Sequence, residues 1–286
     1  MRLIAIASGK GGTGKTTVAT NLAYVASRNG RSVAYLDCDV EEPNGHIFLK
    51  PEIAESGPIE ALVPLVDQEA CEHCGNCGEI CRYSAIVCVG ERALVYPELC
   101  HACGGCALVC PAEAITETPR EMGKLETGHA GSIRFVQGTL NIGEAMSVPS
   151  IKAVKTADAG READLVIIDA PPGTSCPVIE SVKGCDYVAL VTEPTPFGLH
   201  DLKLAVNMIR ALDLPFGVII NRADTGDGEV RSYCRDNDIK MLAEIPDDRR
   251  IAETYSQGAM ICEALPEYEA VFLELLNTLE GRRANT

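Results

Sequence analysis

A glycine-rich loop near the start of the sequence carries the residues needed to hold a polyphosphate. In the stretch IASGKGGTGKTTVATNL, residues 6–22, the pattern G-x-x-x-x-G-K-[ST] is satisfied by Gly9, Gly14, Lys15 and Thr16. In such a loop the backbone N–H groups face the phosphates, the lysine reaches the β- and γ-phosphates, and the hydroxyl is a ligand for Mg²⁺. The loop therefore predicts a nucleoside triphosphate site that contains Mg²⁺.

Eight of the 14 cysteines form two runs with the same spacing. The runs are Cys71-x2-Cys74-x2-Cys77-x3-Cys81 and Cys100-x2-Cys103-x2-Cys106-x3-Cys110. This is the bacterial two-cluster ferredoxin pattern, in which one run supplies three thiolates to a cluster and the other run supplies the fourth. It predicts two [4Fe–4S] clusters, one on Cys71, Cys74, Cys77 and Cys110 and one on Cys100, Cys103, Cys106 and Cys81. Zinc sites pair their ligands differently, which disfavours zinc.

Short apolar runs place three carboxylates near the glycine loop. Residues 3–7 are strand-like, and residues 15–29 have apolar side chains at helical spacing. A second strand-like run, 32–36, ends in Asp37-Cys38-Asp39, and a third, 163–168, ends in Asp169. Ligands bind at the carboxyl ends of parallel strands. We expect Asp169 to contact Mg²⁺ and Asp39 to orient the attacking water. The alternative for each is a cap or turn aspartate.

The rest of the chain alternates strand-like and helix-like segments. They lie at 186–191, 199–212, 216–221, 229–237 and 241–245. This order predicts an α/β fold, a mostly parallel doubly wound P-loop NTPase sheet with an inserted α+β two-cluster ferredoxin domain. We expect residues 1–63 plus 119–286 to form the ATPase domain and residues 64–118 to form the insertion. Residues 131–155 are ambiguous, and the amphipathic segment 267–280 is expected to dock on the core.

The glycine loop and the two strand ends resemble those of the deviant Walker A ATPases, which include MinD, ParA, the Mrp-type cluster carriers and the nitrogenase iron protein. The similar stretches are residues 10–17 (KGGTGKTT), Asp37-x-Asp39 and 169–173 (DAPPG). The resemblance implies that Lys10 reaches across a dimer to phosphates held by the other subunit. It also implies that the loop as a whole binds nucleotide, through Gly9, Lys10, Gly11, Gly12, Thr13, Gly14, Lys15, Thr16 and Thr17.

Two shorter matches extend the resemblance toward the C-terminus. Asn221-Arg222 follows the strand-like run 216–220 and resembles the strand end that reads adenine in the family. Pro246-Asp247 resembles the next loop, which closes over the base. The resemblance thus implies that ATP is the nucleotide, with Lys10, Lys15 and Asp39 as catalytic residues.

Composition limits the partners and the compartment. The 41 acidic and 25 basic residues give a net charge of −16, which argues against nucleic acid and anionic membrane surfaces. No apolar stretch approaches a spanning helix, and no signal peptide pattern is present, so we expect a cytoplasmic protein with reduced thiols. The six cysteines outside the two runs are expected to be buried thiols, with a metal role left open for Cys176; they are Cys38, Cys88, Cys176, Cys185, Cys234 and Cys262.

Together these features predict an ATP-binding and ATP-hydrolysing iron–sulfur protein. We expect a nucleotide-driven dimer switch that is coupled to electron transfer by the two clusters. The expected partners are ATP, a second copy or a similar subunit, and a redox or metallocluster protein. The first alternative is a metallocluster assembly factor or carrier of the Mrp type. The second is a MinD/ParA-like positioning ATPase, which the acidic charge disfavours.

Overall fold

The computed structural model describes residues 1–157, 163–226 and 228–281 of the 286-residue chain. The strands are β1 (Arg2–Ala7), β2 (Val33–Asp37), β3 (Glu52–Val66), β4 (Ile86–Val89), β5 (Arg92–Val95), β6 (Ile115–Ala130), β7 (Ile133–Leu140), β8 (Leu165–Asp169), β9 (Tyr187–Thr192), β10 (Phe216–Asn221) and β11 (Met241–Ile245). The α-helices are α1 (Lys15–Arg28), α2 (Gly45–Leu49), α3 (Asn76–Ile80), α4 (Gly105–Leu108), α5 (Val148–Thr156), α6 (Cys176–Val182), α7 (Pro196–Ala211), α8 (Glu229–Asp236), α9 (Arg249–Ser256), α10 (Ile261–Ala264) and α11 (Glu269–Leu279). Two 3₁₀ turns, η1 (Pro97–Leu99) and η3 (Pro266–Tyr268), complete the elements.

A nine-stranded sheet forms the centre of the molecule, in the order β11-β10-β9-β1-β8-β2-β7-β6-β3. The first seven of these strands are parallel to one another, which confirms the expected mostly parallel α/β fold. β6 and β3 are antiparallel additions at one edge, which the sequence analysis did not predict. In the register, Asp169 pairs with Ile6 on one side and with Asp37 on the other, so these strand ends share one edge.

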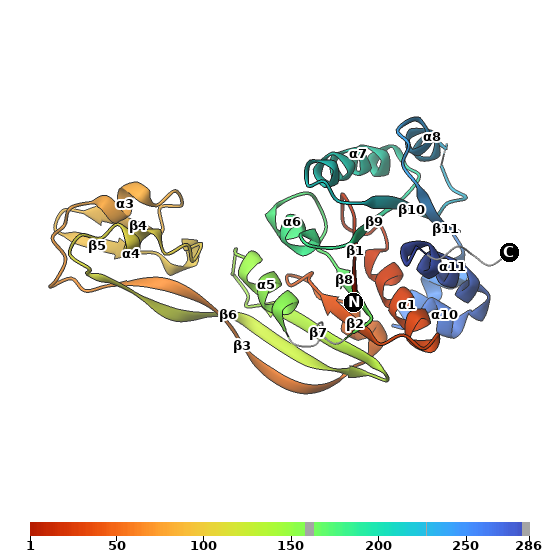
Figure 1. Ribbon diagram of the computed structural model, residues 1–286, viewed down its shortest axis with the longest axis horizontal. Coiled ribbons are helices and arrows are strands. Elements are labelled where there is room, and N and C mark those ends of the chain that lie inside the picture. Colours follow the sequence, from red (N-terminus) through yellow and green to blue (C-terminus); the bar gives the residue numbers. More distant parts are fainter. Residues whose placement is uncertain (158–162, 227, 282–286) are drawn as a thin grey trace.

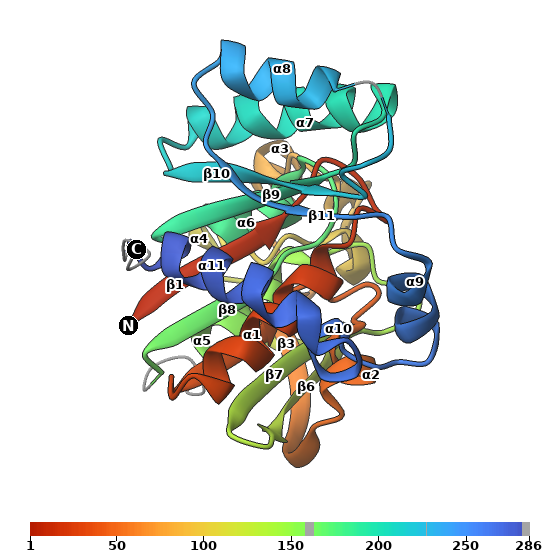
Figure 2. The same ribbon diagram turned by 90° about the vertical axis from the view of Figure 1, so that its right-hand side faces the viewer.

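Helices cover both faces of the sheet, because alternate side chains of its buried strands point to opposite sides. On one face α5, α6, α7 and α8 pack against Ala5, Leu36 and Ile168. On the other face α1, α2, α10 and α11 pack against Ile4, Ile6 and Ile167. Figure 2 shows α1 and α11 side by side over one face. Because helices pack on both faces, the carboxyl ends of the strands are held in fixed positions.

β3 and β6 form a long antiparallel ribbon that leaves the sheet. They pair from Glu52 and His129 to Val66 and Ile115, whereas β6 pairs with β7 only from Gly123 onward. The free part of the ribbon carries residues 67–114, which form the separate lobe seen at its end in Figure 1. The expected domain boundaries, 64 and 118, therefore fall within paired strands rather than in loops, since Pro64 pairs with Glu117.

The C-terminal segment forms α11, preceded by η3, on the face that also carries α1. Phe272, Leu275, Leu276 and Leu279 of α11 are all 1 % exposed, which confirms that this helix docks on the core. In the part of the chain that the structure describes, none of the helices combines the length and the apolar character needed to cross a membrane.

Candidate functional site

The glycine loop connects β1 to α1 and turns at a residue that must be glycine. Gly14 precedes α1 with φ +96°, in the left-handed region that L side chains rarely adopt. A Cβ atom at this position would lie 2.5 Å from Asn221 Nδ2. No side chain caps the N-terminus of α1, so its free N–H groups are available to an anion.

A cavity of about 370 Å³ opens at this helix terminus. Eleven of the residues expected from the sequence line it: Gly11, Gly12, Gly14, Lys15, Thr16, Thr17, Asp39, Asn221, Arg222, Pro246 and Asp247. Sequence reasoning missed the other lining residues: Glu42, Asn44, Pro172, Asp248, Ile251, Ala252 and Tyr255. Three of these come from α9, whose residues 251, 252 and 255 share one side of the helix. They form a partly apolar wall suited to a planar base.

Four expected residues lie beside the cavity and do not line it: Gly9, Lys10, Thr13 and Asp169. A Cβ atom on Gly9 would lie 2.2 Å from the Asp201 carbonyl oxygen, so this glycine allows the loop to approach α7. Thr13 offers its backbone carbonyl to the Asn221 side-chain amide at 2.9 Å. This bond joins the phosphate loop to the end of β10.

Two carboxylates act on the cavity lysine, buried Asp169 and half-buried Asp39. Lys15 is 6 % exposed, and burial lowers its pKa, while Asp169 and Asp39 oppose that shift. Burial raises the pKa of Asp39 to about 6, against the attraction of Lys15. Burial also raises the pKa of Asp169, and Thr16, Lys15 and Tyr35 oppose this. Lys15 is therefore a positive charge that opposes the rise in pKa of both Asp39 and Asp169.

The surroundings of Asp169 fit Mg²⁺. Its Oδ2 atom accepts a hydrogen bond from the Tyr35 hydroxyl at 2.9 Å. Its Oδ1 atom is buried and has no hydrogen-bond partner among the residues that the structure describes. An unpaired buried carboxylate oxygen near the Thr16 hydroxyl is a suitable donor for a hard cation, either directly or through water.

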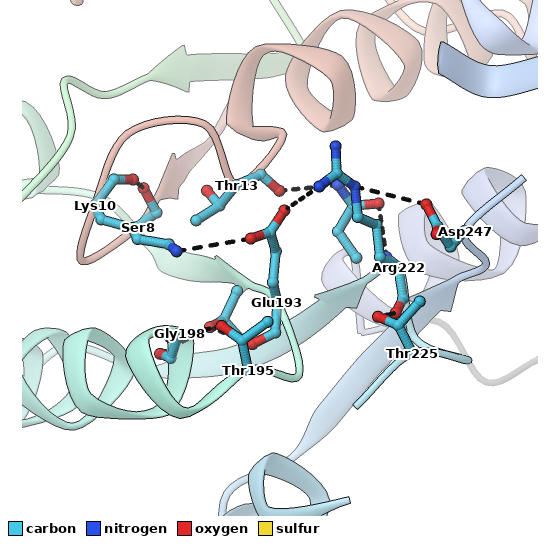
Figure 3. A network of polar contacts seen from close by, with 11 residues as sticks. Ser8, Lys10, Thr13, Glu193, Thr195, Gly198, Arg222, Thr225 and Asp247 are labelled. Atoms are coloured by element: carbon cyan, nitrogen blue, oxygen red, sulfur yellow. Dashed lines mark hydrogen bonds and ion pairs between the residues drawn. The ribbon is translucent and has the colours of Figure 1, made fainter. Parts of the chain in front are cut away.

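A further carboxylate, Glu193, joins two of the expected residues (Figure 3). Its Oε2 atom lies 3.6 Å from Lys10 Nζ, and its Oε1 atom lies 3.1 Å from Arg222 Nη1. Arg222 Nε in turn lies 3.7 Å from Asp247 Oδ1. The sequence analysis missed Glu193. Its position directly after the buried strand β9, like that of Asp39 after β2, was the available signal.

The cysteines of the two runs line two separate cavities in the lobe. One is lined by Cys71, Cys74, Cys77 and Cys110, and the other by Cys81, Cys100, Cys103 and Cys106. These are the two sets expected from the spacing. In the described ranges no three His, Cys, Asp or Glu side chains converge closely enough to form a metal-binding group. Cys88, outside the runs, also lines the first cavity, and its Sγ lies 3.6 Å from Cys77 Sγ.

The backbone of the lobe repeats with the cysteines. His73 and Ala102 occupy the same place in the two runs and have φ +55° and +52°. Ser84 and Glu113, three residues after the last cysteine of each run, have φ +53° and +50°. Left-handed conformations cost non-glycine residues roughly 1–2 kcal/mol each. Because the same strain recurs in both halves, the two loops have one shape, which fits two similar thiolate-bound clusters.

Comparisons with known proteins agree with this architecture. A Methanocaldococcus jannaschii protein named "Uncharacterized protein MJ0579" is 29% identical over 265 residues, which cover 90% of this chain and 90% of that protein. A Pyrococcus furiosus protein named "Iron-sulfur cluster carrier protein" is 25% identical over 280 residues, covering 90% of this chain and 78% of that protein. The septum site-determining protein MinD of Pyrococcus horikoshii, solved with Mg-ADP, has the same fold, with a TM-score of 0.59 at 20% identity and coverage of 98% and 96%.

The family model described as the CobQ/CobB/MinD/ParA nucleotide binding domain matches residues 4–261. This range includes the glycine loop, the three strand-end aspartates and the whole cysteine lobe. The chain belongs to the CobQ/CobB/MinD/ParA family of nucleotide-binding domains.

Proposed function

We propose that this protein binds and hydrolyses ATP with Mg²⁺ in the cytoplasm and uses the nucleotide state to control two [4Fe–4S] clusters. The clusters would sit in the two cysteine-lined cavities and pass electrons to a redox or metallocluster protein. ATP-dependent dimerisation through Lys10, with a second copy or a similar subunit, would be the switch.

The residues of the cavity suggest how the ATP step would proceed. Lys15 and the N-terminus of α1 would neutralise the β- and γ-phosphates. Thr16 and Asp169 would hold Mg²⁺, which supplies charge neutralisation when bound. Asp39, held near Lys15, would accept a hydrogen bond from the attacking water and orient it. Asn221 and the wall from α9 would hold the base.

One observation carries the proposed coupling to the clusters: the ribbon is bound to the loop beside Asp39. This loop, residues 141–147, follows β7. Its Asn141 N–H donates to the Met122 carbonyl of β6 at 2.8 Å. Its Glu144 accepts two hydrogen bonds from Arg120 of β6, one of them at 2.9 Å. Asp39, Glu144 and Pro171 line a common cavity. A change at Asp39 or at residues 169–173 would therefore reach the ribbon.

The test is anaerobic EPR of the dithionite-reduced protein with and without ATP, in the wild type and in Glu144→Gln. We expect ATP to change the cluster signal in the wild type and to change it less in the variant, because Arg120 loses its charged partner. Glu121→Gln is the matched control, since Glu121 follows Arg120 on β6 and is exposed. A wild-type signal that does not respond to ATP would contradict the coupling.

A second candidate function is a metallocluster carrier. The name of the Pyrococcus furiosus relative favours it, as does the fifth thiol, Cys88, in the first cavity. A carrier would transfer iron and sulfide to an apo-protein, and Cys88→Ser would slow that transfer. Complete retention of both clusters during incubation with apo-ferredoxin and ATP would exclude this function in favour of electron transfer.

A further inference from the structure

Glu193 lies where the phosphate side and the base side of the nucleotide cavity meet. It follows β9, which lies between β1 and β10 in the sheet. The loop after β1 carries Lys10, and the end of β10 carries Arg222. Figure 3 shows both cationic side chains directed toward the Glu193 carboxylate from opposite sides. One acidic group thus contacts two residues expected to serve the nucleotide.

Because Glu193 is buried, its contacts with Lys10 and Arg222 are needed to stabilise its charge. The residue is 9 % exposed, and a buried carboxylate is costly unless a positive charge stays close. Its Oε1 atom makes no aligned hydrogen bond within the described ranges, so Arg222 holds it at 3.1 Å by charge. Lys10 is more distant, at 3.6 Å. Because the attraction between two charges falls with their separation, the Lys10 contact is the weaker of the two and breaks at lower cost.

Arg222 is held in place independently of Glu193. Its backbone has φ +53°, and its N–H donates to Asn221 Oδ1 at 3.0 Å. The Asn221 amide also donates to the Thr13 carbonyl. Its guanidinium also has a second carboxylate partner, Asp247, at 3.7 Å. When Lys10 moves away, Arg222 remains as the counter-charge of Glu193.

We propose that Glu193 is a positioning residue that holds Lys10 back in the nucleotide-free protein, with Arg222 sharing its charge so that Lys10 can be released to the phosphates. This inference rests on the proposed dimer role of Lys10. It gives opposite effects for two substitutions in one network. Glu193→Gln frees Lys10, whereas Arg222→Gln removes one of the two cations in contact with Glu193 and strengthens the contact of the other, Lys10.

The experiment measures how fast Lys10 is acylated by acetic anhydride in the nucleotide-free protein, by mass spectrometry, with exposed Lys50 as the internal reference. We expect Glu193→Gln to speed acylation about two- to fivefold, the range for a partly exposed ion pair. We expect Arg222→Gln to slow it. Glu244 lies on β11, next to β10 in the sheet, and forms an ion pair with Arg231 of α8. Glu244→Gln breaks this pair, is the matched control and should change nothing.

A second readout follows ATP-dependent dimerisation by light scattering. Glu193→Gln should lower the ATP concentration at half-maximal dimerisation by a similar factor, and this gain should vanish in the double variant with Lys10→Ala. Equal acylation of Lys10 in the wild type and both variants would overturn the inference, whatever the dimer does. A wild type that stays monomeric with ATP would instead refute the proposed dimer switch, while the acylation rates still decide the role of Glu193.

Discussion

The nucleotide cavity and the cysteine lobe are built in contrasting ways. The cavity residues come from strand ends of a sheet whose two faces are both covered by helices. The lobe hangs on a two-stranded ribbon, and its hydrophobic cluster has Cys77, Ile86 and Ile115 as its buried members. A segment as short as 67–114 cannot gain much stability from such a core. We therefore expect the protein core to preform the first site and the second site to depend on the proposed clusters.

Backbone strain is distributed in the same way. Four of the eight non-glycine residues with positive φ in the described ranges belong to the lobe: His73, Ser84, Ala102 and Glu113. In the nucleotide cavity, Arg222 alone of the residues lining it has this strain. Strain persists only where the surroundings enforce it. In the lobe the apolar packing is too small to do so, so we expect the proposed metal–thiolate bonds to supply this constraint.

The largest expected effect is therefore the response of the lobe to iron loss. Removing iron with a chelator should make residues 67–114 sensitive to protease, because metal binding and folding of such a segment are coupled. The nucleotide domain should keep its melting temperature and its affinity for ATP. Limited proteolysis and calorimetry measure the two parts separately.

Cysteine substitutions give the matched control for this experiment. Cys103→Ala should lose iron, whereas Cys88→Ala, in the same lobe but outside the spacing pattern, should retain about eight iron atoms per chain. If the lobe resists protease without iron, the lobe does not need its clusters to fold, and the proposed contrast between the two regions is wrong.

Lys15→Gln should have the next largest effect. It should weaken ATP binding at the nucleotide cavity and leave the cysteine lobe unchanged. Hydrogen bonds to charged groups contribute roughly 1.5–3 kcal/mol, so ATP affinity should fall about 10- to 150-fold. The iron content of the lobe should stay unchanged. Isothermal titration calorimetry with Mg-ATP, together with iron analysis, tests both statements. Loss of iron in this variant would show that the two regions fold as one unit.

The acidity of Asp39 provides a pH test at the nucleotide cavity. Its pKa is raised to about 6, and the proposed orienting role needs the carboxylate. We expect kcat/KM for ATP, which reports the free enzyme, to fall as the pH drops through about 6. Asp39→Asn should hydrolyse ATP slowly without this pH dependence. The same pH limb in Asp39→Asn would assign the titration to another group.

Asp39 also links pH to stability, with the opposite sign from activity. Because its folded pKa lies above the unfolded value, the neutral form stabilises the fold. This contribution is fully present below the unfolded pKa and is lost as the pH rises through about 6. The free energy of unfolding of the wild type should therefore decrease across this window more than that of Asp39→Asn.

The sequence predicted the nucleotide region better than the connection between the regions. Strands β10 and β11 were expected at the residues where they lie, because continuous apolar runs and flanking turns mark buried parallel strands. The β3–β6 ribbon was missed. The first five residues of β3, from Glu52 to Ser56, are all exposed, and its partner strand begins far away in the sequence. Local patterns do not report such pairing.

Single residues were missed for a similar reason. Glu193 and the α9 wall belong to no spacing motif, and only the order of strands in the sheet brings them to the loop. The two cysteine sets, in contrast, follow from the repeated spacing pattern of the two runs, and the structure groups the same residues around two cavities. A repeated motif therefore predicts the contacts among its own members, while contacts across the sheet require the topology.

The smallest expected effect comes from a substitution in the sheet domain, and it tests whether the cysteine lobe is independent of that domain. Arg31, after α1, donates two hydrogen bonds to Glu280, after α11, at 2.8 and 2.9 Å. The pair is partly exposed, so Glu280→Gln should reduce stability by about 0.5–1 kcal/mol and lower the melting temperature by roughly 1–4 °C. Glu253→Gln, which breaks a far more exposed pair with Arg249, is the control and should change less.

Both substitutions act on the sheet domain only. The EPR spectrum of the reduced lobe should therefore be identical in the wild type, Glu280→Gln and Glu253→Gln. A change in that spectrum with Glu280→Gln would mean that small shifts in the core reach the ribbon without passing through the loop at Glu144.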